Sequence, residues 1–319
     1  MAIYGREGAY SKKCKKKPWT KNDSQLLVLA APATLWYLVF SYLPMFGVII
    51  AFKDYRVLGS FLRSVVVSPW AGIKNFYFLF SNSLMWLVIR NTLLYNTAII
   101  ILGIFVPVAL AIIISEIWNK RLAKLYQTII FFPYFLSWVV VSALVMAFLS
   151  YEAGITNRFI EALGGEKVFW YRNTSFWPPF LVFMSQWKGM GYGMVLYLAS
   201  ITSQDKEIYE AAIIDGATKW QQIRRITLPL LKPVIILLFI LSTGRIFYSD
   251  FGLFYQVPRN TSALFDVVYT IDVFVYQQLK SATTGMAAAA ALLQSAVSCV
   301  MILAVNQIIR KIDPDSAMI

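Results

Sequence analysis

The sequence contains no histidine and only two cysteines among its 319 residues. Without imidazole, a major class of metal ligand is missing, and mechanisms that use histidine as a general base are excluded. Cys14 lies in a run of lysines and Cys299 in an apolar segment, so we expect neither a disulfide framework nor a metal site. The apolar segments also lack paired carboxylates that would suit acid and base catalysis. We therefore predict no catalytic residues, and expect that the chain is not an enzyme.

Charged residues are also scarce, at 14% of the chain, whereas 59% of it is apolar and 16% aromatic. Soluble domains average about 25% charged and about 45–50% apolar residues. This imbalance predicts an integral membrane protein. Lys and Arg outnumber Asp and Glu by 29 to 16. Because membrane proteins concentrate basic residues in cytoplasmic loops, we expect membrane lipid, and no nucleic acid, as the partner of this positive charge.

Six apolar stretches are long enough to cross a hydrocarbon core of about 30 Å, which takes about 20 helical residues. They predict an all-α membrane protein with six transmembrane helices, at about 25–52, 86–114, 128–150, 177–200, 233–256 and 286–309. Apolar character continues past Pro32 to about Phe52, which favours an uncleaved first span over a signal peptide. The six-span domain 25–309 then lies between a basic tail, 1–24, and a short tail, 310–319.

Basic residues predict the orientation of these spans. If the N-terminus is inside, the cytoplasmic segments hold more Lys and Arg than the outer ones, so both termini are predicted to be cytoplasmic. The run from Lys12 to Lys17 serves either as an anchor for this topology or as a binding site for anionic lipid. On the outside, residues 154–170 alternate apolar and polar residues at helical spacing. That amphipathic stretch either contacts a partner protein or covers the ends of the spans.

One polar segment between the fourth and fifth spans, residues 203–233, has a distinctive pattern. It contains Glu-Ala-Ala at 210–212, Gly216 four residues after the second alanine, and Ile-Thr-Leu-Pro at 226–229. We predict a short helix, a bend that Gly216 permits, and a second helix ended by Pro229 and Pro233. The pattern resembles the EAA loop of binding-protein-dependent ABC import permeases. An ordinary amphipathic loop helix would not explain the whole pattern.

The resemblance implies a type I importer fold with a cytoplasmic coupling helix that inserts into an ATPase subunit. The residues that match this loop, and would couple the chain to the ATPase, are Glu210, Ala211, Ala212, Asp215, Gly216 and Ala217. Two other segments, 41–55 and 69–76, look like the complex-oligosaccharide and polysaccharide branch of the carbohydrate importers. The family resemblance places the chain in the bacterial inner membrane.

No Gly-x-x-x-x-Gly-Lys-Ser/Thr phosphate loop occurs in the sequence, so ATP and Mg²⁺ are expected on separate ATPase subunits and no cofactor on this chain. The resemblance implies two such subunits, a second and related permease, and an extracellular binding protein that delivers an oligosaccharide. A rival interpretation is a self-contained secondary transporter or channel, which leaves the EAA pattern unexplained.

Polar residues near the middle of a span are candidates for the solute pathway, because burying them in lipid is costly. Counting along the helices at about 1.5 Å per residue brings several to this depth. The candidates are Gln186, Lys188, Tyr192, Arg245, Tyr248 and Gln294. Their aromatic faces and donor groups suit sugar rings, and the two cations would tolerate an acidic glycan. Alternatively, Lys188 and Arg245 pair with a carboxylate of this chain or of a partner.

Three glycines, Gly189, Gly191 and Gly193, alternate in the fourth predicted span. They indicate either close packing of this helix against a neighbour or a local break. We favour packing.

Overall fold

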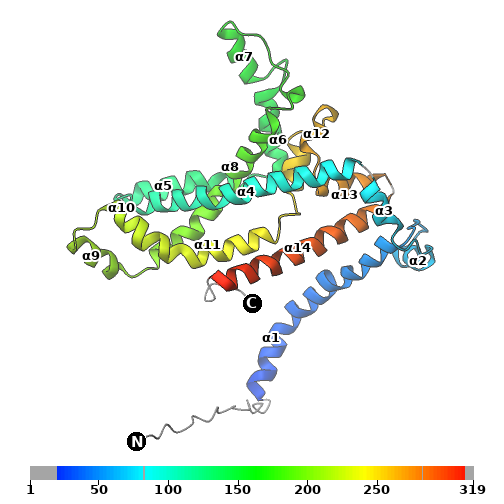
Figure 1. The fold of residues 1–319 in the computed structure, drawn as a ribbon, viewed down its shortest axis with the longest axis horizontal. Helices are drawn as coiled ribbons and strands as arrows, with labels where there is room; N and C mark the ends of the chain where they lie inside the picture. Colours follow the sequence, from blue (N-terminus) through cyan, green and yellow to red (C-terminus); the bar gives the residue numbers. More distant parts are fainter. Residues whose placement is uncertain (1–19, 82, 282, 313–319) are drawn as a thin grey trace, which may run out of the picture. The chain divides into compact units, whose positions relative to one another are not determined.

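A computed structural model describes residues 20–81, 83–281 and 283–312 (Figure 1). Within these ranges the chain is almost entirely helical and contains no β-strand, only an isolated bridge between Lys53 and Trp70. The predicted all-α class is therefore confirmed for the described residues. Contacts divide the chain into two compact units, residues 1–47 and 48–319.

A long helix begins in the first unit. Helix α1 (Lys21–Tyr37) starts with a capping box, in which Thr20 and Asp23 each accept a hydrogen bond from the other's backbone N–H. It continues through a π turn, η1 (Leu38–Tyr42), and a 3-10 segment, η2 (Leu43–Phe52). The resulting 32-residue helix is apolar enough to span a membrane, as predicted for 25–52. The lysine run, Cys14 and most of both predicted tails lie outside the described residues.

Three more helices of the described chain have the length and composition of a span. They are α4 (Ser83–Ser115), the continuous helix from Lys219 to Thr243, and α14 (Thr284–Ile312). The expected spans 86–114 and 286–309 are confirmed as such helices. Including the helix of the first unit there are four candidate spans, or five with one bent pair, instead of the six expected.

The third expected span, 128–150, is wrong as a straight helix. The chain forms α5 (Lys120–Phe131), a 3-10 turn η3 (Phe132–Phe135) and α6 (Trp138–Leu149), with a bend of 97° between the two halves. Pro133 lies in the turn, where its missing N–H is tolerated. Ser137 then caps α6 by accepting a hydrogen bond from the N–H of Val140, so a new helix starts in a new direction.

The fourth expected span corresponds to α8 (Trp177–Thr202), a continuous helix of 26 residues. It is long enough to cross a membrane, but it is not among the helices that qualify by hydropathy. Its middle contains Gln186, Lys188 and the three alternating glycines, which lower its apolar character.

The fifth expected span, 233–256, starts earlier and ends earlier than predicted. Short helix α10 (Lys219–Gln222), the π turn η5 (Ile223–Thr227) and α11 (Leu228–Thr243) form one continuous helix. Pro229 and Pro233 do not end a helix: Pro229 lies in the first turn of α11 and Pro233 inside it. The π turn η5 ends at Thr227, just before Leu228 and Pro229. It changes the pattern of backbone hydrogen bonds at the point where an α-helix would need the N–H that proline lacks.

After Thr243 the chain leaves the helix, and short elements follow. They are the π turn η6 (Gly252–Gln256), the 3-10 turn η7 (Ser262–Leu264), α12 (Phe265–Val268) and α13 (Ile271–Lys280). In the second unit α4 packs along α8, α11 contacts α4, α8 and α14, and α13 packs on α14 (Figure 1). One buried core surrounds Trp177 and Phe254, and another surrounds Tyr197 and Leu231.

The two segments that carry the carbohydrate-importer resemblance meet in the second unit. Asp54 N donates to Pro69 O at 3.0 Å, and the Asn75 amide donates to Ala51 O at 2.8 Å. Between them lies α2 (Phe61–Val67), and α3 (Lys74–Ser81) begins inside the second segment. The buried Lys53 ammonium binds the carbonyl of Ser68 just beyond the end of α2, at 3.2 Å, and lies over the ring of Trp70.

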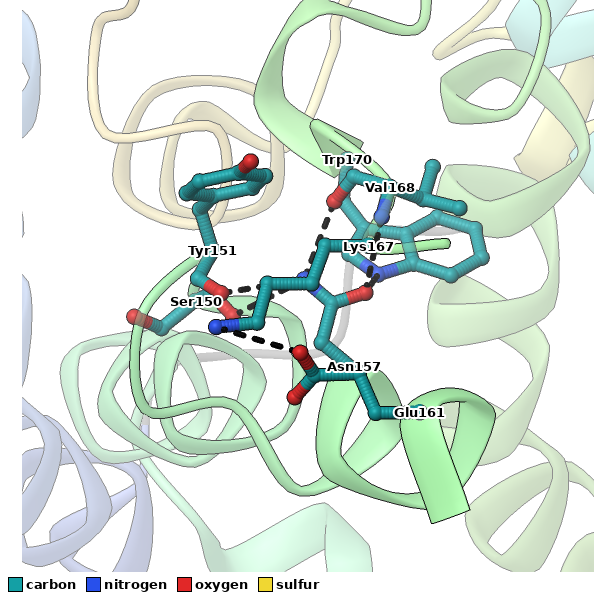
Figure 2. A network of polar contacts seen from close by, with 7 residues as sticks. All are labelled: Ser150, Tyr151, Asn157, Glu161, Lys167, Val168 and Trp170. Atoms are coloured by element: carbon teal, nitrogen blue, oxygen red, sulfur yellow. Dashed lines mark hydrogen bonds and ion pairs between the residues drawn. The ribbon is translucent and has the colours of Figure 1, made fainter. Parts of the chain in front are cut away.

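Residues 150–170 form what we call the α7 cap, which continues from α6 (Figure 1). Its helix α7 (Ile155–Ala162) confirms the predicted amphipathic helix, and the side chains of Ile155 and Phe159 are exposed. Asn157 is completely buried at the centre of the cap (Figure 2). Its amide donates to the carbonyls of Ser150, Tyr151 and Val168, and its Oδ1 accepts from Val168 N and Trp170 Nε1, both at 3.1 Å.

Asn157→Ala should loosen the α7 cap, because it leaves several buried backbone groups and the Trp170 indole N–H without partners. Each such group costs about 1–3 kcal/mol. We expect faster hydrogen exchange and faster proteolysis across residues 150–170, measured on the purified protein. Arg158→Ala, at an exposed position of the same helix, is the matched control. Equal exchange rates in the two variants would contradict this role for Asn157.

The glycines of α8 differ in their surroundings. A Cβ on Gly191 would collide with the backbone of Ile130 and Phe131, and one on Gly193 would lie 2.9 Å from Pro107, whereas one on Gly189 would meet nothing within 4 Å. Because α8 is continuous through all three, close packing is confirmed at Gly191 and Gly193.

Gly191→Ala and Gly189→Ala form a matched pair. Alanine in a helix is favoured over glycine by about 1 kcal/mol, so Gly189→Ala should raise or preserve the melting temperature. Gly191→Ala should lower it, because the backbone of Ile130 and Phe131 cannot yield without separating α8 from the end of α5, at a cost of about 1–3 kcal/mol. Thermal unfolding in detergent tests the pair. A melting temperature for Gly191→Ala at or above that of Gly189→Ala would contradict the packing argument.

Candidate functional site

A polar pocket of about 370 Å³ lies between α4, α8, α11 and the residues after α11. Four of the six predicted pathway residues line it, namely Gln186, Tyr192, Arg245 and Tyr248. These residues come from two segments more than fifty residues apart. The sequence could place them only at a similar depth in the membrane, and the structure brings them into one pocket. Lys188 and Gln294 are not among the lining residues.

Gln186 and Tyr192 enter the pocket from α8. The Gln186 amide donates to the Ile99 carbonyl of α4 at 3.1 Å. The exposed ring of Tyr192 is stacked on the ring of Tyr134, with centroids 5.1 Å apart and planes 14° from parallel. Tyr192 therefore presents a flat face whose orientation is held by a second aromatic ring.

Lys188 lies beside the pocket and binds the same aromatic residue. Its ammonium donates to the carbonyl of Tyr134 at 2.8 Å and lies 5.3 Å and 5.5 Å from the ring centroids of Tyr134 and Trp138. These distances fit cation–π contacts. Among the described residues no carboxylate forms an ion pair with Lys188, so the alternative of pairing within this chain finds no support there.

Arg245 and Asp250 bring opposite charges to the pocket lining. Arg245 is exposed, and within the described part of the chain no carboxylate pairs with it. Asp250 accepts from Trp138 Nε1 at 2.6 Å through one oxygen and from Gly252 N at 2.9 Å through the other. The Asp250 carboxylate is thus held by neutral donors, and the Arg245 guanidinium is available to a ligand.

The segment from Gly244 to Asp250 forms one wall of the pocket with backbone that is not helical, a turn up to Phe247 and irregular after it. Asn96 donates to the carbonyls of Ile246 and Tyr248 at 2.7 Å and 2.9 Å. Gln294 donates to Phe247 O at 2.7 Å. Side chains from α4 and α14 therefore satisfy the carbonyls that this segment leaves without helical partners. Gln294, which is 3% exposed, supports the pocket wall from behind.

Sequence reasoning missed Asn96, Asp250 and Asp272. Asp272 accepts from the N–H of Ser249 at 2.6 Å and from its hydroxyl at 2.8 Å, which ties the pocket wall to α13. Asn96 lies inside the predicted span 86–114, so the depth criterion applied to Gln186 would have found it. Asp250 lies inside the expected span 233–256, and as an ionisable residue there it was a candidate by the same criterion. Asp272 had no such signal, because it falls between the expected spans.

The pocket has the groups for binding a polar solute, with aromatic faces at Tyr192 and Tyr248, a cation and an anion. Tyr248 is further held by a 2.9 Å hydrogen bond between its hydroxyl and that of Ser295. Among the described residues no group of three or more acidic or sulfur side chains is placed to hold a metal ion. These groups match the stacking and hydrogen-bonding chemistry of hydroxyl-rich or acidic solutes.

The predicted coupling residues lie on a helix–bend–helix segment that follows the C-terminal end of α8. Helix α9 (Lys206–Ile214) is capped by Asp205, and Gly216 has a φ of +78°, a left-handed conformation that favours glycine. The N–H of Ala217 binds the carbonyl of Ala212 at 2.9 Å, closing the end of α9. The loop therefore contains a short helix followed by a bend at Gly216.

This loop presents an unusual surface. Glu210, Ala211, Asp215 and Gly216 are exposed, and Ala212 and Ala217 are half-buried. Beside them the large apolar side chains of Ile213, Ile214 and Trp220 are also exposed, Ile214 by 85%. Lys219 joins the loop to Glu116, just beyond the end of α4, by an ion pair of 2.9 Å, and the Tyr209 and Thr227 hydroxyls are 3.1 Å apart. A rigid loop with an apolar exposed face is typical of a protein-binding surface.

Comparison with known proteins supports the family resemblance that the loop carries. Residues 108–314 match the family described as binding-protein-dependent transport system inner membrane component. The chain is 34% identical to Protein LplB of Bacillus subtilis, covering 92% of this chain and 91% of that one. It is 32% identical to the polygalacturonan/rhamnogalacturonan transport system permease protein YteP of the same organism, covering 90% and 88%.

Solved structures are similar over the same length. A chain of a bacterial ABC transporter involved in the import of the acidic polysaccharide alginate has a TM-score of 0.82, with 31% identity over 92% of this chain and 97% of that one. A second structure of a bacterial alginate ABC transporter, in complex with an alginate pentasaccharide-bound periplasmic protein, has a TM-score of 0.81 at the same identity and covers 92% and 96%. The resemblance read from the EAA pattern is confirmed.

Proposed function

Because the chain belongs to the family of inner membrane components of binding-protein-dependent transport systems, we propose that it is one of two permease subunits of an ATP-driven oligosaccharide importer. The second subunit is a related permease, and the two enclose the pathway between them. ATP and Mg²⁺ bind to two separate ATPase subunits, and an extracellular binding protein delivers the solute. The chain lies in the bacterial inner membrane with both termini in the cytoplasm.

The observation that carries this proposal is the continuity between the exposed loop and the polar pocket. Helix α8 enters the loop and the Lys219–Thr243 helix leaves it, and both line the pocket, through Gln186 and Ser242 respectively. A push on α9 therefore reaches the pocket along two helices. In the proposed cycle the ATPase binds the loop through Glu210 to Ala217, and its closure moves these helices so that the pocket opens to alternate sides.

The solute is proposed to be an oligosaccharide of a complex glycan. This rests on the names of YteP and of the alginate importers, and on the pocket itself. Tyr192 and Tyr248 offer faces for sugar rings, and Arg245 offers donors for hydroxyls or carboxylates. A self-contained secondary transporter would also need polar groups at this depth, but it would give the exposed Ile213, Ile214 and Trp220 no partner.

Reconstitution distinguishes an ATP-driven importer from a self-contained secondary transporter. Proteoliposomes that contain this chain, the second permease and the ATPase subunits should take up oligosaccharide only with ATP inside, where the ATPase sites face, and with the binding protein outside. Uptake by the isolated chain on an ion gradient alone would contradict the proposal.

Gly216 provides a sharp test of the coupling loop. Valine strongly disfavours the left-handed conformation, so Gly216→Val should displace α9 and greatly reduce both ATPase co-purification and uptake, by about tenfold or more for a strain above about 1.4 kcal/mol. Asparagine tolerates this conformation, and no atom lies within 4 Å of the added Cβ. Gly216→Asn should therefore keep both activities near wild type. Wild-type coupling in the valine variant would remove the bend from the mechanism.

Arg245 and Lys188 test the solute pathway in different ways. Arg245→Ala should reduce uptake about tenfold, because an unpaired guanidinium in the pocket is lost, at a cost of about 1.5–3 kcal/mol if it contacts solute. Lys188→Ala should have a smaller effect, through release of Tyr134 and Tyr192. Arg158→Ala on α7 is the control. Stimulation of ATPase activity by the loaded binding protein, measured alongside, distinguishes a lost solute contact from lost assembly. Unchanged uptake in both variants would exclude these residues from the pathway.

A further inference from the structure

A second and larger cavity, of about 840 Å³, lies between α4 and α8. On α4 its lining recurs at four-residue spacing, through Leu94, Ala98, Leu102 and Val106, which follows one face of the helix. On α8 the aromatic side chains of Phe183 and Trp187 line it. The cavity is thus an elongated groove parallel to two helices, and its volume is in the range of ligand sites. Gln186 lines both this groove and the polar pocket, so α4 and α8 meet between the two.

Three neutral polar side chains of the groove lining donate to backbone carbonyls of the protein. The Tyr95 hydroxyl donates to Val267 O at 2.7 Å, and the Asn91 amide donates to Asp266 O at 3.0 Å and to Tyr269 O at 3.2 Å. The Gln186 amide donates to Ile99 O. An occupant of the groove therefore meets mainly hydrocarbon, which does not suit a sugar.

Arg90 lies at one end of the groove and is the charged residue of its lining. Its guanidinium donates to Asn91 Oδ1 at 3.1 Å and to Asp266 O at 3.4 Å, which are both neutral acceptors. Among the described residues no carboxylate lies within ion-pairing distance of it, although the exposed side chain of Asp266 belongs to the same neighbourhood. Arg90 thus brings an uncompensated positive charge with free donors to the end of an apolar groove.

The depth of Arg90 matches that of a phospholipid headgroup. Helix α4 is about 50 Å long, about 20 Å more than the hydrocarbon core, so about 10 Å extends beyond the core at each end. Arg90 lies about 10 Å from the start of the helix at Ser83, and hence near the boundary. From Arg90 to Val106 the lining on α4 extends about 24 Å, so the groove covers the roughly 15 Å of one leaflet and continues past the middle of the membrane.

We propose that this groove binds an anionic phospholipid, with an acyl chain along α4 and α8 and the headgroup phosphate on Arg90. The apolar lining selects an alkyl chain, and the charge at its end selects the anionic headgroup. The lipid belongs to the leaflet at the N-terminal end of α4, which is the outer leaflet in the proposed orientation. The competing occupant is the second permease.

Native mass spectrometry of the purified complex, with all its companion subunits, tests the site with phosphatidylglycerol as the probe. Arg90→Gln should lower phosphatidylglycerol occupancy about fivefold, as expected for one basic residue near a membrane surface. It should lower phosphatidylcholine occupancy by less, because the choline cation offsets the charge of the phosphate. Ala98→Phe, which fills the groove, should lower the retention of both lipids. Arg63→Gln, at an exposed arginine of α2, is the control and should retain the wild-type occupancy.

A photo-reactive benzoylphenylalanine in place of Leu102 identifies the occupant directly. We expect cross-links to phospholipid. Cross-links to the second permease instead, or equal phosphatidylglycerol retention in Arg90→Gln and Arg63→Gln, would overturn the proposal. Both measurements are made on assembled protein and need no transport, so their outcome is independent of the solute that the importer carries.

Discussion

The requirement that every backbone polar group be satisfied inside a membrane determines where this chain can leave the helix. Lipid offers no hydrogen bonds, so a non-helical segment at this depth is stable only where protein surrounds it or where it lines a cavity. The residues from Gly244 to Asp250 meet this condition because Asn96, Gln294 and Asp272 supply partners from three other helices. The polar pocket is the cavity that this segment lines, so the same polar residues maintain both the break in the helix and the site.

Sequence patterns predicted the apolar helices well where a single helix crosses without interruption. The lengths around 25–52, 86–114 and 286–309 were recognisable because hydropathy is a property of each segment alone. The bend at Leu136 and Ser137 was missed although Pro133 and the cap at Ser137 are local features. The early end of the fifth helix was missed because the following segment depends on Asn96, Gln294 and Asp272, which are distant in the sequence. Pro229 and Pro233 were wrongly expected to end a helix, because a π turn upstream accommodates proline without ending the helix.

The candidate pocket was partly predictable, since depth along a helix brought Gln186, Tyr192, Arg245 and Tyr248 to one level. Depth along a helix does not specify the direction in which a side chain points. Gln294 was therefore grouped with these residues, although it is buried and supports the pocket wall through Phe247 O. The loop at 205–222 was easier to predict than the pocket. Its caps, its glycine and its small residues act locally, and Asp205, Thr218 and Gly216 each perform the task that their type suggests.

The 97° bend also constrains how the chain enters the bilayer during synthesis. Helices α5 and α6 are each about 18 Å long, well short of the roughly 30 Å of the hydrocarbon core, so neither is a stable insertion unit alone. Helix α5 and the turn η3 pack on α8, whereas α6 packs on α7 and η6. Because α7, α8 and η6 all follow the bent pair in the chain, α5 and α6 leave the ribosome before these packing partners do.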